Sequence, residues 1–382
     1  MKKVVSIFLV LSMAVAALAG CGSSSKNKDA FYIGGIGPTT GTAAIYGNAV
    51  QNGAQIAVDE INAAGGINGH KVEFKFEDDQ ADAEKSVNAY NSLKDWGMQM
   101  LVGSVTSSAC MAVTTQTAKD NMFQITPSAS AKDVIKNDNV FQVCFTDPNQ
   151  GIASADYIAK NQIGKKVAVI YNSSDVYSSG IEEKFAKEAK SKGLDIVAEE
   201  AFTDDSKTDF STQLQKAQSA GADLVFLPIY YTEASIILQQ ASSMSYAPKF
   251  FGCDGLDGIL GVKNFDTKLA ENVMLLTPFA ADAKDTNTVK FVEAYKKAYK
   301  DTPNQFAADA YDSVYIIKAA AEQEKLSPSA STKEICDAMK KGMATVKVNG
   351  LTGTGMSWGN SGAVSKEPKA VKIQNGAYVS MD

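Results

Sequence analysis

The sequence predicts an α/β protein built from two doubly wound lobes with mostly parallel sheets. From residue 30 onwards, short apolar runs alternate with segments whose apolar residues recur at helical spacing. This alternation is typical of a parallel sheet covered by helices on both faces. The rhythm breaks at Asp147-Pro148 and then starts again, which indicates a second unit of the same kind. A chain of 382 residues, 45% of them hydrophobic, is large enough for one or two globular domains with substantial cores.

The first unit is expected to contain four strands separated by three helices. Residues 71–79 alternate apolar and polar side chains, as a half-buried strand does. The segment 45–64 has helical periodicity and ends at Gly65-Gly66, a common helix stop. The expected strands are residues 31–37, 71–79, 98–104 and 122–128. The expected helices are residues 45–64, 81–96 and 107–121.

The second unit repeats the alternation, and the chain then returns to the first. The expected helices of the second unit are residues 149–162, 177–193, 210–221 and 232–244. Its expected strands are residues 165–172, 194–202, 222–230 and 249–255. A further strand at 272–280 precedes two helices, 288–301 and 307–323, which we expect to pack on the first unit. The last ~30 residues, with Trp358 and a hairpin-like pair at 370–381, are expected to close the second unit.

This order predicts two Rossmann-like lobes joined by a hinge of three segments. Lobe 1 is expected to comprise residues 30–145 and 279–357, and lobe 2 residues 146–278 and 358–382. The hinge segments are expected near residues 144–147, 277–279 and 358–360.

The N-terminus has the pattern of an exported lipoprotein. Lys2 and Lys3 precede an apolar stretch that is too short for a comfortable membrane-spanning helix. The stretch ends in Leu18-Ala19-Gly20-Cys21, which resembles the bacterial lipobox. We therefore expect residues 1–20 to be a signal peptide, Cys21 to carry the lipid, and residues 21–29 to form a tether.

The expected mature protein is acidic and is held at the membrane by its acyl chains alone. The first twenty residues contain two lysines and no acids, so their removal lowers the net charge from −6 to −8. This charge argues against nucleic acid as a partner. We expect an extracytoplasmic monomer anchored through Cys21.

Two residue types that are scarce or missing restrict the chemistry. His70 is the sole histidine and lies in the turn-like GGINGHK, and all 37 basic residues are lysine. A catalytic triad or a histidine-ligated zinc site would have to be built around that turn. The glycines of GGIGPTTG are not followed by GK[ST], and no GxSxG surrounds Ser107. We therefore expect no enzyme activity, no metal and no cofactor.

The remaining cysteines match no CxxC metal or redox motif, and we read them first as small buried hydrophobes. These cysteines are Cys110, Cys144, Cys253 and Cys336.

Hydroxyl side chains gather where two neighbouring strands are expected to end. The first cluster is GSVTSSA, residues 103–109, and the second is ITPSAS, residues 125–130. In an open parallel sheet, ligands bind beyond the carboxyl ends of the strands, where helix N-termini attract anions. An anion site and ordinary helix capping by Ser107 or Ser108 both remain open from the residues alone. Asp254 in a turn and Tyr230 or Phe306 in a core also remain open.

A family resemblance covers nearly the whole expected mature chain, from about residue 31 to 355. Residues 36–74 closely resemble the opening of the leucine/isoleucine/valine-type solute-binding proteins of ABC transporters. The motifs VGSVTSSA, ITPSAS, FQVCFTDPNQG, SSDVYSSG and the pair YYTE with FFGCDG resemble that family as well. The resemblance implies the periplasmic-binding-protein type 1 fold, with two lobes that close over a free amino acid.

The resemblance also implies roles for individual residues. Ser107 matches the serine that binds the ligand α-carboxylate, and Ser128 the position whose main-chain carbonyl accepts the α-ammonium. Ser130 matches a hydroxyl that contacts both groups, and Asp254 an acidic residue that pairs with the ammonium from the opposite lobe. The residues implied around the ligand side chain are Tyr46, Thr106, Tyr177, Tyr230 and Phe306.

Two departures from the family pattern affect these expectations. Gln142 stands where arginine is common in the family, so some local packing contact differs. Thr106 with Ser130 makes the pocket more polar than a purely aliphatic one, which puts strict leucine selectivity in doubt.

The resulting expectation is a lipid-anchored protein that binds a neutral, aliphatic or small amino acid and delivers it to an ABC permease. The alternatives are an amino-acid sensor that feeds a receptor, and a binder of a related small amide or amino-acid analogue.

Overall fold

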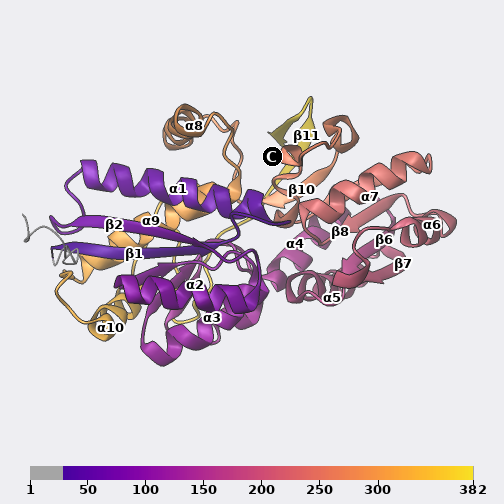
Figure 1. Ribbon diagram of the computed structural model, residues 1–382. Helices are drawn as coiled ribbons and strands as arrows, with labels where there is room; N and C mark the ends of the chain where they lie inside the picture. Colours follow the sequence, from indigo (N-terminus) through magenta and orange to yellow (C-terminus); the bar gives the residue numbers. More distant parts are fainter. Residues whose placement is uncertain (1–28, 382) are drawn as a thin grey trace, which may run out of the picture.

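The computed structural model describes residues 29–381, and two sheets with their helices form two lobes side by side (Figure 1). The predicted signal peptide and Cys21 lie outside the described residues. The first sheet has five parallel strands in the order β2-β1-β3-β4-β5. Its strands are β1 (Ala30–Gly37), β2 (Lys71–Asp78), β3 (Met100–Val102), β4 (Phe123–Thr126) and β5 (Val140–Gln142).

Helices cover both faces of the first sheet because its strands bury side chains on both sides. Phe31, Met100 and Val102 belong to a core shared with the α1, α9 and α10 face, whereas Ile36 and Leu101 pack with α2 and α3. The helices of this lobe are α1 (Ala44–Ala63), α2 (Ala83–Trp96), α3 (Ser107–Asp120), α8 (Thr286–Tyr299), α9 (Gln305–Gln323) and α10 (Thr332–Met343).

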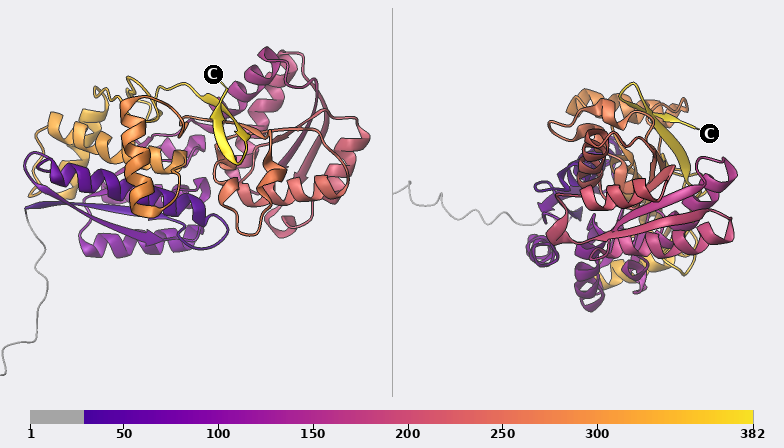
Figure 2. Two further views of the ribbon diagram at one scale, coloured as in Figure 1. Left: turned by 90° about the horizontal axis from the view of Figure 1, so that it is seen from above. Right: turned by 90° about the vertical axis from the view of Figure 1, so that its right-hand side faces the viewer.

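The second sheet has seven strands in the order β12-β11-β10-β9-β8-β6-β7. Five of them are parallel, and β11 and β12 join as an antiparallel hairpin at the edge. The hairpin lies next to the junction of the lobes (Figure 2). The strands are β6 (Lys166–Asn172), β7 (Asp195–Phe202), β8 (Leu224–Leu227), β9 (Lys249–Gly252), β10 (Met274–Thr277), β11 (Lys369–Gln374) and β12 (Ala377–Ser380).

The second sheet is also covered on both faces. Val167, Val169 and Phe226 pack with α4 and α5, and the opposite face packs with α6 and α7. The α-helices are α4 (Asp147–Lys160), α5 (Val176–Ser191), α6 (Ser211–Ser219) and α7 (Tyr231–Ser243). Short 3₁₀ turns complete the fold: η1 (Lys132–Ile135), η2 (Asp204–Ser206), η3 (Asp254–Leu256), η4 (Ile259–Gly261) and η5 (Thr267–Ala270).

The predicted fold class is confirmed, with two mostly parallel α/β lobes. The chain passes between the two sheets after β5, after β10 and before β11, while the limits proposed for the lobes remain a prediction. Two elements were not predicted: the short strand β5 and the helix α10. The cysteines Cys110, Cys144, Cys253 and Cys336 are free and buried. Among residues 29–381, no helix is both long and apolar enough to span a bilayer.

Candidate functional site

A small cavity lies between the lobes, at the carboxyl ends of strands from both sheets. This is where ligands bind in open α/β sheets, because the loops there lead into helix N-termini. The structure brings together every predicted pocket residue except Ser130. The lining residues are Tyr46, Val105, Thr106, Ser107, Ser128, Tyr177, Tyr230, Asp254, Gly255 and Phe306.

The first hydroxyl cluster forms the N-terminus of α3, which faces this cavity. Gly103 has a φ of +130°, and a Cβ there would lie 2.4 Å from the main-chain oxygen of Ile36. Glycine is therefore required where the chain leaves β3 and turns into the helix. Thr106 is the N-cap residue but makes no side-chain capping bond, and no acid stands in the first turn.

Ser107 joins the two hydroxyl clusters. Its Oγ accepts hydrogen bonds from the N–H groups of Ser130 and Ala131, each at 3.1 Å. These two bonds use the acceptor capacity of the hydroxyl oxygen, so its one proton remains available for donation. Ser104 instead bonds to Ser86, at 2.6 Å between the hydroxyl oxygens, and Ser108 is exposed. Capping of α3 by Ser107 or Ser108, which the residues alone left open, does not occur, because the N-cap residue is Thr106.

The second cluster presents main-chain atoms and two hydroxyls without partners. Ser128 Oγ donates to the main-chain oxygen of Val105 at 2.8 Å. Within residues 29–381, the buried hydroxyls of Thr106 and Ser130 make no hydrogen bond. Ser130 is fully buried but does not line the cavity. A buried hydroxyl without a partner costs free energy. The Ser130 hydroxyl has the Asp147 carboxyl as a neighbour and lowers the pKa of that group, so the Thr106 hydroxyl is the clearer case of a group that lacks a partner within the described chain.

Asp254 brings a carboxylate to the same cavity from lobe 2. It is 4% exposed, and Oδ1 accepts a hydrogen bond from the Tyr177 hydroxyl at 2.7 Å, while Oδ2 accepts one from the Gln150 amide at 3.0 Å. Burial raises the pKa of Asp254 to about 7, although both hydrogen bonds oppose the shift. None of the ion pairs between residues 29 and 381 involves Asp254.

A second buried carboxyl, Asp147, lies at the start of α4. Its N–H donates to the main-chain oxygen of Ser130 at 2.9 Å, and neither carboxyl oxygen has a hydrogen-bond partner within the described chain. Burial, together with the charges of Asp254 and Asp175, raises its pKa well above the ordinary value. The Ser130 hydroxyl opposes this rise in the pKa of Asp147, and Asp254 is the carboxyl that accepts two side-chain hydrogen bonds.

Aromatic rings form the remaining wall. Tyr177 stacks on Tyr230 with ring centroids 4.9 Å apart, and Tyr46 packs on Phe306 at 4.2 Å. The Tyr46 hydroxyl donates across the lobes to the main-chain oxygen of Gly255. Burial raises the pKa of Tyr46, Tyr177 and Tyr230 well above the ordinary value, so these hydroxyls stay neutral at physiological pH.

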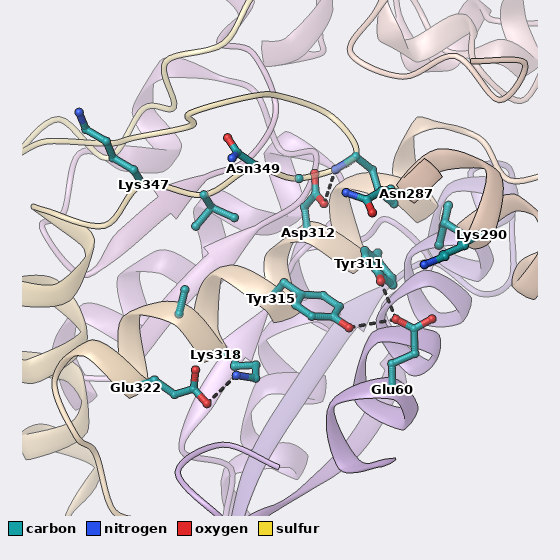
Figure 3. Close-up of a pocket in the computed structure, with 15 residues that line it drawn as sticks. Glu60, Asn287, Lys290, Tyr311, Asp312, Tyr315, Lys318, Glu322, Lys347 and Asn349 are labelled. Carbon is teal, nitrogen blue, oxygen red and sulfur yellow. Dashed lines mark hydrogen bonds and ion pairs between the residues drawn. The ribbon is translucent and has the colours of Figure 1, made fainter. Parts of the chain in front are cut away.

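The lobes are closed upon this cavity. Its volume is only about 10 Å³, about the space of a single water molecule. By the same measure a larger cavity of about 490 Å³ lies on the outside of lobe 1 (Figure 3). There, Tyr311 and Tyr315 both donate hydrogen bonds to Glu60, and none of the predicted site residues lines it. We therefore place the functional site between the lobes rather than in the larger cavity.

Three amide side chains were missed as parts of the site. Gln150 holds Asp254 at both its carboxylate and its N–H, and Gln305 donates to the main-chain oxygen of Asp254 at 2.9 Å. Gln142, noted only as a departure from the family, donates to the main-chain oxygens of Ala129 and Ala131 and so fixes the second hydroxyl cluster. The motif FQVCFTDPNQG contains Gln150 but does not reveal its partner, and no motif marks Gln305, because both partners are distant along the chain.

Comparison with known proteins agrees with this architecture. The family model for periplasmic binding proteins matches residues 30–377. A Leu/Ile/Val-binding protein homolog of Brucella melitensis is 32% identical over 321 residues, which cover 82% of this chain and 84% of that protein. The Leu/Ile/Val-binding protein BraC3 of Rhizobium johnstonii is 32% identical over 343 residues, or 89% of each chain.

A solved structure is similar along nearly its whole length. The branched-chain amino acid transporter substrate-binding protein of Streptococcus pneumoniae, in complex with isoleucine, is 30% identical with a TM-score of 0.82. The match covers 92% of this chain and 99% of that one. The chain therefore belongs to the periplasmic binding protein family, as a solute-binding protein of the leucine/isoleucine/valine type with the type 1 two-lobed fold.

Proposed function

We propose that the protein captures a neutral amino acid with an aliphatic or small side chain, of the leucine, isoleucine or valine kind, between its two lobes. One observation carries the proposal. A helix N-terminus without a capping acid and a buried carboxylate without a cation line the same closed cavity from opposite lobes. A zwitterion of amino-acid size satisfies both groups at once, because its carboxylate suits the first and its ammonium the second.

The carboxylate half of the site is supported by a comparison of the helices that begin around the cleft. Asp82 caps α2 and Asp175 caps α5 through their side chains, and α7 has Glu233 in its first turn. The first turns of α1 and α3 both lack an acid and a side-chain cap. In α1 the N–H groups of residues 44–46 have acceptors, whereas within the described chain those of Ser107, Ser108 and Ala109 in α3 have none. We infer that these N–H groups and the Ser107 hydroxyl bind the α-carboxylate.

The ammonium half of the site consists of oxygen acceptors. Asp254 provides a hydrogen-bonded carboxylate, and no donor within residues 29–381 reaches the main-chain oxygen of Ser128. The unpartnered Ser130 hydroxyl lies behind them. We infer that Asp254 and the Ser128 carbonyl bind the α-ammonium, and that Ser130 turns its hydroxyl towards the α-groups when the ligand is present.

The aromatic wall sets the size of the ligand side chain. Burial of an aliphatic side chain against Tyr46, Tyr177, Tyr230 and Phe306 contributes roughly 1.5–3 kcal/mol. Micromolar affinity corresponds to about 8 kcal/mol, so the α-group contacts and lobe closure must supply most of the binding free energy. The unpartnered Thr106 hydroxyl extends the expected range to small polar side chains such as threonine.

Delivery and anchoring complete the proposal. We infer that the closed, loaded form is recognised by an ABC permease, because ligand binding shifts the population towards closure. We also infer that the lipid on Cys21 holds the protein at the outer side of the cytoplasmic membrane. Both inferences rest on the family and on the N-terminal pattern.

The proposal is tested by a thermal shift screen against the twenty amino acids, followed by calorimetry on the ones that respond. We expect the largest shifts with leucine, isoleucine and valine, and smaller ones with threonine and alanine. A response restricted to sugars or peptides would contradict the proposed ligand class.

A further inference from the structure

The first residue of α9 makes polar contacts that cross between the lobes. Gln305 begins α9, which packs on α1 in lobe 1, and it touches the η3 turn after β9 in lobe 2. We propose that Gln305 is a positioning residue that, together with Asp257, latches the closed lobes and holds Asp254 in its place. The part of this proposal that concerns ligand affinity rests on the proposed function of Asp254.

Every polar group of Gln305 that faces the junction has a partner there. Its N–H donates to Asp257 Oδ2 at 2.8 Å, and its Nε2 donates to the main-chain oxygen of Asp254 at 2.9 Å. Its Oε1 accepts from the Thr277 hydroxyl at 3.2 Å, at the end of β10 where the chain crosses between the sheets. The Gln305 side chain therefore connects lobe 1 to the main chain of Asp254 in lobe 2. It also contacts Thr277, in the segment where the chain crosses between the sheets.

These contacts are buried and are not needed to cap the helix. Gln305 is 2% exposed and Asp257 is 4% exposed. The N-cap of α9 is already served by Asn304, whose side chain accepts from the N–H of Ala307. Asp257 is thus an additional acceptor that reaches a helix N-terminus from the other lobe, an arrangement favoured by the helix dipole.

The contact to Thr277 is made where the chain crosses between the sheets, so lobe rotation does not by itself break it. The two contacts to Asp257 and Asp254 join α9 of lobe 1 to the η3 turn of lobe 2, so a rotation of one lobe against the other separates them. They consequently stabilise the closed state relative to the open one, and they do so whatever fills the cleft. Since the encounter of ligand with open protein precedes closure, loss of the latch is expected to speed dissociation and to leave association nearly unchanged.

The experiment compares Gln305→Leu with a matched control in lobe 1. Gln99 is also a buried glutamine that makes two hydrogen bonds, one from the N–H of Tyr32 and one to the main-chain oxygen of Pro328. Gln99→Leu therefore also removes two hydrogen bonds of a buried glutamine side chain, but neither of them lies at the junction between the lobes. Association and dissociation rates are measured by stopped-flow fluorescence with the amino acid that binds the unaltered protein most tightly.

We expect Gln305→Leu and Asp257→Ala to raise the dissociation rate roughly tenfold, the usual effect of losing a buried hydrogen bond, with association rates within about twofold. Asp257→Asn keeps an acceptor of the same size and should stay close to the unaltered protein. Gln99→Leu should lower the melting temperature and leave both rates unchanged. An unchanged dissociation rate in Gln305→Leu, or an equal rise in Gln99→Leu, would overturn the latch.

Failure of the proposed function is distinguishable from failure of the latch. If no amino acid binds the unaltered protein, the ligand class is wrong, and small-angle X-ray scattering then tests the latch on the same proteins. The latch predicts a larger radius of gyration for Gln305→Leu and Asp257→Ala than for the unaltered protein and Gln99→Leu. Equal radii for all four proteins would contradict it.

Discussion

Replacement of Asp254 by asparagine should weaken amino-acid binding and at the same time stabilise the protein without ligand. The folded-state pKa of Asp254 is about 7, raised by burial from the ordinary 3.8. Each pKa unit corresponds to about 1.4 kcal/mol, so an ionised Asp254 lowers the free energy of unfolding by about 4 kcal/mol at pH 8. Asparagine removes this cost but mismatches the Gln150 amide, at about 1 kcal/mol. The expected net gain at pH 8 is therefore about 3 kcal/mol.

The size of this effect depends on pH. A carboxyl whose pKa is raised in the folded state takes up a proton on folding between about pH 4 and pH 7, so its presence lowers stability as the pH rises through that range. At pH 5 Asp254 is already protonated in the folded protein, and its cost falls to about 1.6 kcal/mol, the equivalent of roughly 1.2 pKa units, so the net gain from Asp254→Asn is below about 1 kcal/mol. Urea unfolding at pH 5 and pH 8 measures both values.

The affinity should change in the opposite direction. Removing one partner of a buried ion pair costs about 3–5 kcal/mol, which is a loss of roughly 150-fold to 5,000-fold in affinity. The matched control is Asp312→Asn: Asp312 is buried, accepts from the N–H groups of Leu351 and Thr352, and lies outside the ligand cavity. This variant should keep its affinity. Asp254→Asn that binds amino acids as tightly as the unaltered protein would refute the ammonium assignment.

Three further predictions concern the same site. Ser107→Ala should weaken binding at least tenfold and lower the free energy of unfolding by about 1–3 kcal/mol, because two buried N–H groups lose their acceptor. Ser108 is exposed, so Ser108→Ala should leave the affinity measured by calorimetry nearly unchanged. Affinity should fall about tenfold per pH unit below pH 7, as Asp254 takes up a proton, and calorimetry that shows a flat profile from pH 5 to pH 8 would contradict this. Gly255→Ala should weaken binding, because a Cβ there lies 2.6 Å from the Tyr177 hydroxyl and displaces it from Asp254; affinity equal to that of the unaltered protein would exclude this role for Gly255.

The strands and most helices could be predicted because their patterns are local. Residues 71–79 alternate apolar and polar side chains, and β2 occupies Lys71–Asp78. The missed helix α10 also had a local signal: Ser331 and Glu334 form a capping box, and Ile335, Met339 and Met343 are buried at helical spacing. The short strand β5 had no such signal, since three residues are too few to show a period.

The predicted site residues come together because the ends of parallel strands meet at one edge, which the order of elements already implies. The supporting amides could not be predicted in this way. Gln150 and Gln305 lie 104 and 51 residues from Asp254 in the chain. The contact of Gln305 depends on how the lobes close, and that of Gln150 on how α4 and the η3 turn meet within lobe 2. Ser130 is fully buried and does not line the cavity, and its N–H donates to the Ser107 hydroxyl.

The central claim is that both α-groups of one ligand are bound, the carboxylate at α3 and the ammonium at Asp254. Calorimetry at pH 8 with leucine and its two truncated analogues tests this most directly. 4-Methylpentanoate lacks the ammonium, and 3-methylbutylamine lacks the carboxylate, while both keep the aliphatic side chain. The structure predicts that each analogue binds at least roughly 100-fold more weakly than leucine, because each leaves one buried group unpaired. An analogue that binds as tightly as leucine would contradict the account.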